Sequence, residues 1–413
     1  MKSPASTAAP TDDLLAQPVS DPRDWMHDPT LAFLNHGAFG SCPRPVLEQQ
    51  SEWRLRMERQ PLQFLARELE THLDAARGEL AEFVGAAAED LVFVTNTTTG
   101  INTVLRSLEF QAGDELLVTD QEYNASRNAL NYVAERSGAR VVVAKLPFPV
   151  REEGELIAPI LDAVSPRTRL ALLDHVTSST GLVLPLEQII DELSARSIDA
   201  LVDGAHAPGM IPLNLQELGA AYYTGNCHKW LCAPKGAALL HVRRNRQELI
   251  RPLTISHGAN SPRTDRLRFQ IEFGWTGTWD PSACLSVPAA LRFIGSQLPG
   301  GWPAVMARNH ALALAARKIL GEALKTPEPC PPEFIGSLAS LPIPDAPANA
   351  LPRPPIFEYP LQDEIRLCHH IEVPILAWPA PPKRLLRIAP HLYNSLPQYE
   401  ALATALIEAL RSE

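Results

Sequence analysis

The sequence predicts an α/β protein built around a mostly parallel sheet. Short apolar runs alternate with amphipathic stretches between residues 91 and 203, and crossovers of roughly 20–30 residues between successive runs are typical of βαβ units. Hydrophobic residues make up 45% of the chain and charged residues 20%, which is ordinary for a folded globular protein. At 413 residues, the chain is long enough for two to three domains of about 150 residues each.

The expected strands are continuous apolar runs, because helices cover both faces of a parallel sheet. They span residues 91–94, 115–119, 140–144, 170–174 and 200–203, with one more strand at 236–242. Helices are expected between them at 101–108, 126–136 and 186–196. A ligand of such a sheet binds at the carboxyl ends of its strands, so the residues that follow these runs are the first candidates for a functional site.

The flanking regions have a different pattern. A long helical pattern runs from Val46 to Val84, and further helices are expected at 288–297, 309–324 and 396–411. Eleven of the 39 prolines fall between Pro327 and Pro360, so this stretch is expected to be rich in loops. We therefore expect an N-terminal arm at 1–30, a large domain at 31–285 and a smaller α+β C-terminal domain at 286–413.

Charge and cysteine usage exclude several classes of protein. Lys and Arg number 37 against 47 Asp and Glu, which gives a formal net charge of −10 and argues against a binder of nucleic acid or of an anionic membrane. The N-terminus has no apolar signal-peptide core, and no 18-residue apolar window is present. The six cysteines show no disulfide or zinc spacing. A soluble cytoplasmic protein without a metal is expected.

The first chemical signal is a polar turn, Asn96–Gly100, between an expected strand and an expected helix. The apolar residues from Ile101 onward recur at helical spacing, so the turn lies at a helix N-terminus. Free backbone N–H groups and the helix dipole bind anions there, and Thr97 and Thr98 add hydroxyl donors. The turn predicts a phosphate site, although a plain threonine cap has the same pattern.

Two further signals lie later in the chain. Asp203 ends an apolar run and is followed by small residues, which places an acid at the ligand edge of the sheet; a capping aspartate is the alternative. Lys229 lies between His228 and Trp230 in an otherwise apolar stretch. A lysine that is removed from water has a lowered pKa and forms Schiff bases, whereas a lysine with its stem on the surface is the alternative.

Together these three signals describe a site for pyridoxal 5'-phosphate (PLP). Lys229, which comes 26 residues after Asp203, would hold the cofactor aldehyde as an imine. The carboxylate would keep the pyridine nitrogen protonated, so that the ring can accept electrons. The polar turn would hold the phosphate.

Seven segments carry a resemblance to a known family. The chain resembles the class V aminotransferase superfamily of fold-type I PLP enzymes and, within it, the isopenicillin-N epimerase-like group, a relative of the cysteine desulfurases. The segments, in family order, are Phe33–Gly40, Asn96–Gly100, Asp174–Gly181, Val202–Gly209, Thr224–Gly236, Gly274–Thr278 and Arg387–Asn394. The resemblance implies the fold-type I PLP-dependent transferase fold, with a large PLP-binding domain.

The resemblance also implies roles for single residues. Lys229 would carry the internal aldimine and move the Cα proton, and Asp203 would pair with the pyridine nitrogen. Tyr123 would stack on the ring where relatives often have His. His206 and Ser178 would lie near the phenolic oxygen of the ring, although relatives often have Asn at the position of Ser178.

The remaining implied roles concern phosphate and substrate. Thr97, Thr98, Asn226 and His228 would hold the phosphate. Thr278 would reach the phosphate of a second subunit, which implies a homodimer with shared active sites. Arg387 would bind the α-carboxylate of the substrate, because a guanidinium binds a carboxylate through two parallel hydrogen bonds. His36 is a further candidate for contact with the substrate.

Several reactions remain open on the sequence. An epimerase or racemase acting on an amino acid or an amino-acid-containing peptide comes first by resemblance, and it needs a second acid/base, for which Tyr123, His36 and His175 are candidates. A carbon–sulfur β-lyase is the close alternative. A cysteine desulfurase comes third, because neither Cys330 nor Cys368 lies in a segment like the desulfurase loop. An aminotransferase and an inactive regulatory subunit with a PLP fold are the remaining alternatives.

Overall fold

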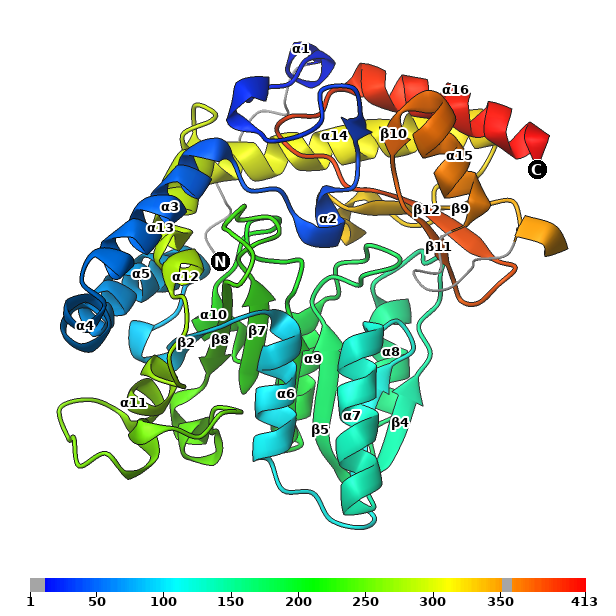
Figure 1. The fold of residues 1–413 in the computed structure, drawn as a ribbon. Coiled ribbons are helices and arrows are strands. Elements are labelled where there is room, and N and C mark those ends of the chain that lie inside the picture. Colours follow the sequence, from blue (N-terminus) through cyan, green and yellow to red (C-terminus); the bar gives the residue numbers. More distant parts are fainter. Residues whose placement is uncertain (1–11, 351–358) are drawn as a thin grey trace.

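The computed structural model describes residues 12–350 and 359–413, and its centre is a seven-stranded sheet (Figure 1). The strand order is β2-β8-β7-β6-β5-β3-β4, and β8 is the strand that runs antiparallel to both of its neighbours. The strands are β2 (Leu91–Val94), β3 (Glu115–Thr119), β4 (Arg140–Ala144), β5 (Thr168–Asp174), β6 (Asp199–Asp203), β7 (Tyr222–Asn226) and β8 (Ala238–Val242). The predicted mostly parallel α/β sheet is confirmed.

Helices cover both faces of this sheet and form two apolar cores. Alternate residues along a strand point to opposite faces: on β6, Leu201 belongs to the core beneath α6 and α7, whereas Val202 belongs to the core beneath α5 and α9. The helices of this layer are α5 (Leu69–Val84), α6 (Thr97–Ser107), α7 (Asn124–Ser137), α8 (Gly154–Asp162), α9 (Leu186–Ala195), α10 (Leu215–Leu218) and α11 (Arg268–Gly274).

The single helical stretch expected from Val46 to Val84 is divided in the structure. Gln60 has φ −150° and ψ 80°, and Pro61 has no N–H to continue the hydrogen-bond ladder. The sequence pattern did not detect this break, because apolar residues recur at helical spacing on both sides of it. The segment consists of α3 (Arg44–Arg59), α4 (Pro61–Gln63), a π-helical turn η2 (Phe64–Glu68) and α5 (Leu69–Val84).

The C-terminal part of the chain forms a second layer above the carboxyl ends of the large sheet (Figure 1). An antiparallel sheet of order β11-β12-β9 lies beside two long helices that pack on each other. These elements are α12 (Ser282–Leu285), α13 (Val287–Gly295), α14 (Gly301–Leu324), β9 (Ala339–Ile343), α15 (Pro360–His369), β10 (Ile371–Glu372), β11 (Ile375–Ala377), β12 (Arg384–Ile388) and α16 (Leu396–Ser412).

The N-terminal segment packs on this C-terminal layer. The short helix α1 (Asp12–Ala16) contacts α14 and α16, and β1 (Ala32–Phe33) pairs in parallel with β10. The helix α2 (His36–Phe39) follows directly and brings the chain to the carboxyl edge of the large sheet. The domain limits 1–30, 31–285 and 286–413 remain a proposal. In the described ranges, every helix is too short or too polar to cross a membrane.

Candidate active site

A cavity of about 140 Å³ lies at the carboxyl edge of the large sheet, where the sequence predicts the ligand site. The structure brings most of the predicted site residues to it, although they come from five separate segments of the chain. Among its lining residues are Thr97, Thr98, Tyr123, Ser178, Asp203, His206, Asn226, His228 and Lys229.

One end of this cavity is the N-terminus of α6. Asn96 caps the helix by accepting a hydrogen bond from the Thr99 backbone N–H at 2.8 Å. Asn226, at the end of β7, accepts one from the Thr97 N–H at 2.9 Å, which joins the two sides of the turn. Thr97 Oγ1 and His228 Nδ1 are buried and have no hydrogen-bond partner. Such orphaned polar atoms beside a helix N-terminus fit a bound phosphate.

Asp203 lies at the end of β6 and is 2% exposed. Ser126 Oγ donates to its Oδ2 at 2.7 Å, and the Ala205 N–H donates to its Oδ1 at 3.0 Å. Burial raises the pKa of the Asp203 carboxyl, while these two donors and the Lys229 charge act in the opposite direction. These two hydrogen bonds hold the carboxyl in place. A protonated ring nitrogen would be the cation that stabilises this buried carboxylate.

Lys229 follows β7 and faces the same cavity. Burial, and after it the nearby Arg387 charge, lower the pKa of its ammonium group from 10.5 to about 7. Its Nζ lies 3.1 Å from His206 Nε2, and the Trp230 Nε1–H donates to His206 Nδ1 at 3.4 Å. Because Nδ1 accepts this bond, Nε2 carries the proton of the neutral ring and can donate to a neutral amine.

His36 lies behind Lys229 and is completely buried. Its Nδ1 is 2.8 Å from the Tyr393 hydroxyl, and its Nε2 is 3.0 Å from the Lys229 carbonyl oxygen. Burial lowers its pKa well below the usual range, so the ring is neutral and donates to that carbonyl. The predicted contact of His36 with the substrate has no counterpart among the residues that line the cavity; in the structure His36 holds the backbone of the lysine.

His36 also belongs to a buried group with Cys232 and His391, whose ligand atoms lie within 4.8 Å of one another. Both nitrogens of His36 are already engaged, and Cys232 Sγ lies 3.5 Å from His391 Nε2. Burial raises the pKa of the Cys232 thiol well above its usual range, which disfavours the thiolate that a metal requires. These contacts explain the cluster as a hydrogen-bonded support behind the site. The expectation of no metal remains a prediction.

Arg387, on β12, is 5% exposed. It lies outside the cavity lining but close enough for its charge to lower the pKa of Lys229. Its Nη1 donates to the Ser178 carbonyl oxygen at 2.6 Å, and its Nε is buried without a partner. Burial lowers its pKa to about 10, so it remains a cation at neutral pH. Ser178 therefore accepts from Arg387 through its carbonyl oxygen and, at 3.5 Å, through its hydroxyl, and the guanidinium keeps donors that can bind a carboxylate.

Three other predicted residues occupy different positions. Tyr123 precedes α7, lines the cavity and is 48% exposed. His175 follows Asp174 and so points to the opposite face of the sheet, where its Nδ1 lies 2.9 Å from the Tyr223 hydroxyl. Thr278 is exposed and lies outside the cavity lining, so within one subunit it does not reach the predicted phosphate position.

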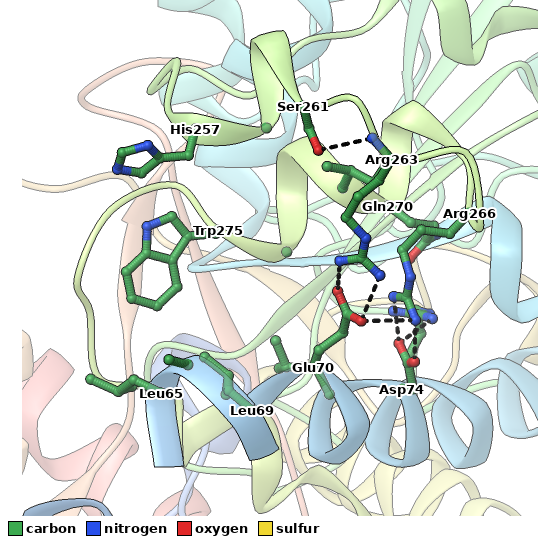
Figure 2. A pocket seen from close by; sticks show the side chains of 16 residues that line it. Leu65, Leu69, Glu70, Asp74, His257, Ser261, Arg263, Arg266, Gln270 and Trp275 are labelled. Atoms are coloured by element: carbon green, nitrogen blue, oxygen red, sulfur yellow. Dashed lines mark hydrogen bonds and ion pairs between the residues drawn. The ribbon is translucent and has the colours of Figure 1, made fainter. Parts of the chain in front are cut away.

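A larger hollow of about 370 Å³ lies between α5 and residues 257–275 (Figure 2). Arg263 pairs with Glu70 at 2.7 Å and Arg266 with Asp74 at 2.8 Å at one side of it. Trp275, a residue of the Gly274–Thr278 segment, lies at the other side. Its charged groups are already paired with one another, so this hollow offers no reactive group comparable to Lys229.

Sequence reasoning missed several residues of the site. Ser126, which binds Asp203, comes from the first turn of α7 and lies 77 positions away in sequence. Glu122 and Asp174 are buried acids beside Asp203. The pattern of an acid that directly ends an apolar strand, which identified Asp203, also applies to Asp174 and could have found it.

The residues present fit PLP. Thr97, which carries one orphaned atom, begins α6, and His228, which carries another, lines the same cavity. The anchored Asp203 carboxyl and the Lys229 amine belong to this cavity as well. An acid for the ring nitrogen, a lysine of lowered pKa and an anion site are the groups that this cofactor requires.

Comparisons with known proteins agree with this geometry. The sequence profile of the Aminotransferase class-V family matches residues 33–326. Isopenicillin N epimerase of Amycolatopsis lactamdurans is 36% identical over 395 residues, which cover 92% of this chain and 96% of the relative. A probable chloroplastic L-cysteine desulfhydrase of Arabidopsis thaliana is 30% identical over 405 residues, which cover 92% of this chain and 83% of the relative.

A solved structure has the same fold. It is a C-DES variant with glycine covalently linked to the PLP cofactor, and it superposes with a TM-score of 0.77 at 22% identity, covering 94% of this chain and 99% of the other. The family match, the relatives and the arrangement around Lys229 lead to one conclusion: the chain belongs to the class V aminotransferase family of fold-type I enzymes and is a PLP-dependent enzyme.

Proposed function

We propose that the enzyme acts at the Cα of an amino acid or an amino-acid-containing peptide, as an epimerase or racemase similar to isopenicillin N epimerase. The observation that carries this proposal is the Lys229 amine, which faces the cavity with its pKa lowered to about 7. An amine in this state can accept and return a proton near neutral pH. The relative named isopenicillin N epimerase supports the assignment by its 36% identity.

The protein groups have distinct tasks in this reaction. When bound, PLP withdraws electrons from the Cα of an attached amino acid. Arg387 binds the α-carboxylate and thereby orients the Cα–H bond toward the Lys229 side. Lys229 removes or returns the Cα proton on its own face of the site. Asp203, fixed by Ser126 and Ala205, holds the ring nitrogen.

Epimerisation also needs a proton on the opposite face, and we assign it to Tyr123. Of the three candidates, Tyr123 lines the cavity, whereas both nitrogens of His36 are engaged and His175 points to the other side of the sheet. The Tyr123 residue is about half exposed, at 48%. Tyr123 can therefore exchange a proton with water, which a second acid/base must do.

A carbon–sulfur β-lyase is the second candidate, because a relative of 30% identity is named an L-cysteine desulfhydrase. It would use the same Lys229 and Arg387 but would lose a sulfur substituent from the substrate after Cα deprotonation. A cysteine desulfurase is less well supported. In the described part of the chain, no cysteine lines the cavity, and Cys330 is 3% exposed. Cys368 is exposed but lies on α15.

Incubating the enzyme with a panel of amino acids and peptides in deuterated water tests the proposal. Following Cα exchange, chirality, pyruvate and sulfide together separates the reactions. An epimerase exchanges the Cα proton and inverts the centre without releasing pyruvate. Pyruvate and sulfide formed together from cysteine would instead establish the lyase, and sulfur transferred to an enzyme cysteine would establish a desulfurase.

We also propose a homodimer with shared active sites and a cytoplasmic place of action. Thr278 is exposed and lies outside the cavity of its own subunit, as expected for a residue that completes the site of a second subunit. Six free cysteines, five of them buried, are consistent with a reducing compartment.

A further inference from the structure

Two buried acids beside Asp203 have no task in the proposed reaction. Asp174 ends β5 in register with Asp203 at the end of β6. Register partners of neighbouring parallel strands point to the same face of the sheet, here the face beneath α6 and α7. Asp174 lines the cavity and is 2% exposed. Glu122, in the connection before α7, is 9% exposed and lies next to Asp174.

The hydrogen-bond donors around the three acids are unevenly distributed. Asp203 receives hydrogen bonds at both oxygens, from Ser126 and from Ala205. In contrast, both oxygens of Glu122 and the Oδ2 of Asp174 are buried without a well-formed hydrogen bond among the described residues. The Tyr123 N–H is the shared donor near them, and it acts to lower the pKa of both acids, against the larger effect of burial. An ionised carboxylate is only an acceptor, so two neighbouring carboxylates cannot satisfy each other. One proton between them turns the contact into a hydrogen bond.

The surrounding charges do not compensate for two further anions. Asp203 on β6 repels both groups, and the cations that face this region are Arg127 on α7 and Lys229 after β7. Arg127 acts on Glu122 only weakly, and its Nε is bonded to Asn131. Lys229 acts on Asp203, and the neighbouring His206 is neutral because burial lowers its pKa. Burial raises the pKa values of Glu122 and Asp174 well above the usual range.

We infer that Glu122 and Asp174 are a hydrogen-bonded pair of protonated acids, which stays un-ionised at neutral pH and leaves Asp203 as the carboxylate of this end of the cavity. The pair is a positioning element: it packs against Asp203 without competing for the ring nitrogen of the cofactor. The different hydrogen-bond donors thus give the three adjacent carboxyls different protonation states: Asp203 is ionised, whereas Glu122 and Asp174 are protonated. Neighbouring acids in different surroundings commonly divide their roles in this way. The inference rests on the proposed use of Lys229 with PLP but not on the choice between epimerase and lyase.

The acid pair has a consequence for the protein without cofactor. A carboxyl whose pKa is raised on folding binds more protons in the folded than in the unfolded state. The free energy of unfolding therefore falls as the pH rises from about 4, the pKa of the acids in the unfolded chain, toward their pKa in the folded protein. Above the folded pKa the full loss of stability is present. Glu122→Gln and Asp174→Asn imitate the protonated acids, so they remove this cost.

The first test measures thermal unfolding of cofactor-free protein between about pH 5 and pH 9. The double variant Glu122→Gln, Asp174→Asn is expected to stay folded, to lose most of the fall in unfolding temperature with pH, and to exceed the wild type at pH 8. The matched control is Glu115→Gln. Glu115 is 2% exposed, but it is bonded to Ser165, Arg167 and Arg140, which lower its pKa, so this variant should lose stability at neutral pH.

The second test detects the proton directly. The infrared spectrum of the wild type at neutral pH should contain the C=O stretch of a protonated carboxylic acid, shifted in deuterated water and absent from the double variant. If the double variant differs from the wild type only by the loss of carboxylate bands, the inference is wrong. It is also wrong if the double variant is destabilised in the same way as Glu115→Gln. Cofactor attachment to Lys229 is measured separately by reductive trapping, so failure of the acid pair and failure of the proposed function give different results.

Discussion

The Nζ of Lys229 lies 3.1 Å from His206 Nε2, and His206 is oriented by the Trp230 N–H on its other nitrogen. The imidazole therefore donates to a neutral amine, while His36 holds the carbonyl of the same lysine from behind. Burial and the nearby Arg387 charge lower the pKa of the ammonium to about 7, so a large fraction of the amine is free of its proton at neutral pH. Both the backbone and the side chain of the reactive residue are thus fixed before a cofactor is bound.

The rate at which cofactor-free enzyme attaches PLP should follow the ionisation of Lys229. Because the pKa of its ammonium is lowered to about 7, the rate should rise with pH and level off above about pH 8. Arg387→Leu removes a charge that lowers this pKa, so the transition should move to higher pH. Lys235→Met is the control, because the charges that shift the pKa of Lys229 are those of Arg387 and Asp203. Stopped-flow absorbance measures the rate, and a transition near pH 10 would contradict the account.

Replacing Arg387 by Lys should reduce activity on α-amino acids. The change keeps the charge but loses the planar pair of donors, and truncating a buried charge-assisted pair costs about 2–4 kcal/mol. This corresponds to about 30- to 1000-fold in kcat/KM. Steady-state kinetics should show a much smaller loss on amines that have no carboxylate. If both substrate types lose activity equally, Arg387 supports the structure and the carboxylate binds elsewhere.

Gly100 allows α6 to approach β7 beneath the phosphate end of the site. A Cβ at this position would lie 2.1 Å from Thr224 Oγ1, so Gly100→Ala should destabilise the protein by about 1–3 kcal/mol. The control is Gly78→Ala in α5, where nothing lies within 4 Å and helix propensity predicts a gain of about 0.5–1 kcal/mol. Urea unfolding midpoints measure both. A Gly100→Ala protein as stable as the wild type would contradict the close contact.

Mixing two inactive variants tests the shared active site. A heterodimer of Lys229→Ala and Thr278→Ala subunits contains one site with neither defect if Thr278 acts across the interface. Random mixing should then restore about a quarter of the wild-type activity. Formation of heterodimers, confirmed by differently tagged subunits, without any return of activity would place the contact within one subunit or show that it is unimportant.

The strands of the large sheet could be predicted because a parallel sheet is buried on both faces. Its strands, such as Glu115–Thr119, therefore read as continuous apolar runs. The strand β7 (Tyr222–Asn226) was not predicted, because Thr224, Gly225 and Asn226 interrupt the apolar run. Tertiary contacts account for these residues: Thr224 packs against Gly100, and Asn226 binds the Thr97 N–H.

The chemistry of the site was visible where the local sequence carries it: Asp203 ends an apolar strand, and Lys229 lies between His228 and Trp230 in an otherwise apolar stretch. Contacts that form when distant segments fold together could not be predicted from the sequence. His36 is separated from Lys229 by 193 positions, and no local pattern shows that it supports the lysine from behind. The register of β5 against β6, which places Asp174 beside Asp203, likewise depends on pairing that a single strand does not encode.

Reductive trapping of the cofactor tests the central claim most directly. The purified holoenzyme is treated with borohydride, digested, and mapped by mass spectrometry. The account predicts a yellow protein that loses its colour on reduction and carries the pyridoxyl label on Lys229, with no label in Lys229→Ala. Lys235, whose Nζ donates to the Gly40 carbonyl oxygen at 3.1 Å, is the nearest alternative in sequence. A label on Lys235 instead of Lys229 would contradict the assignment of the site.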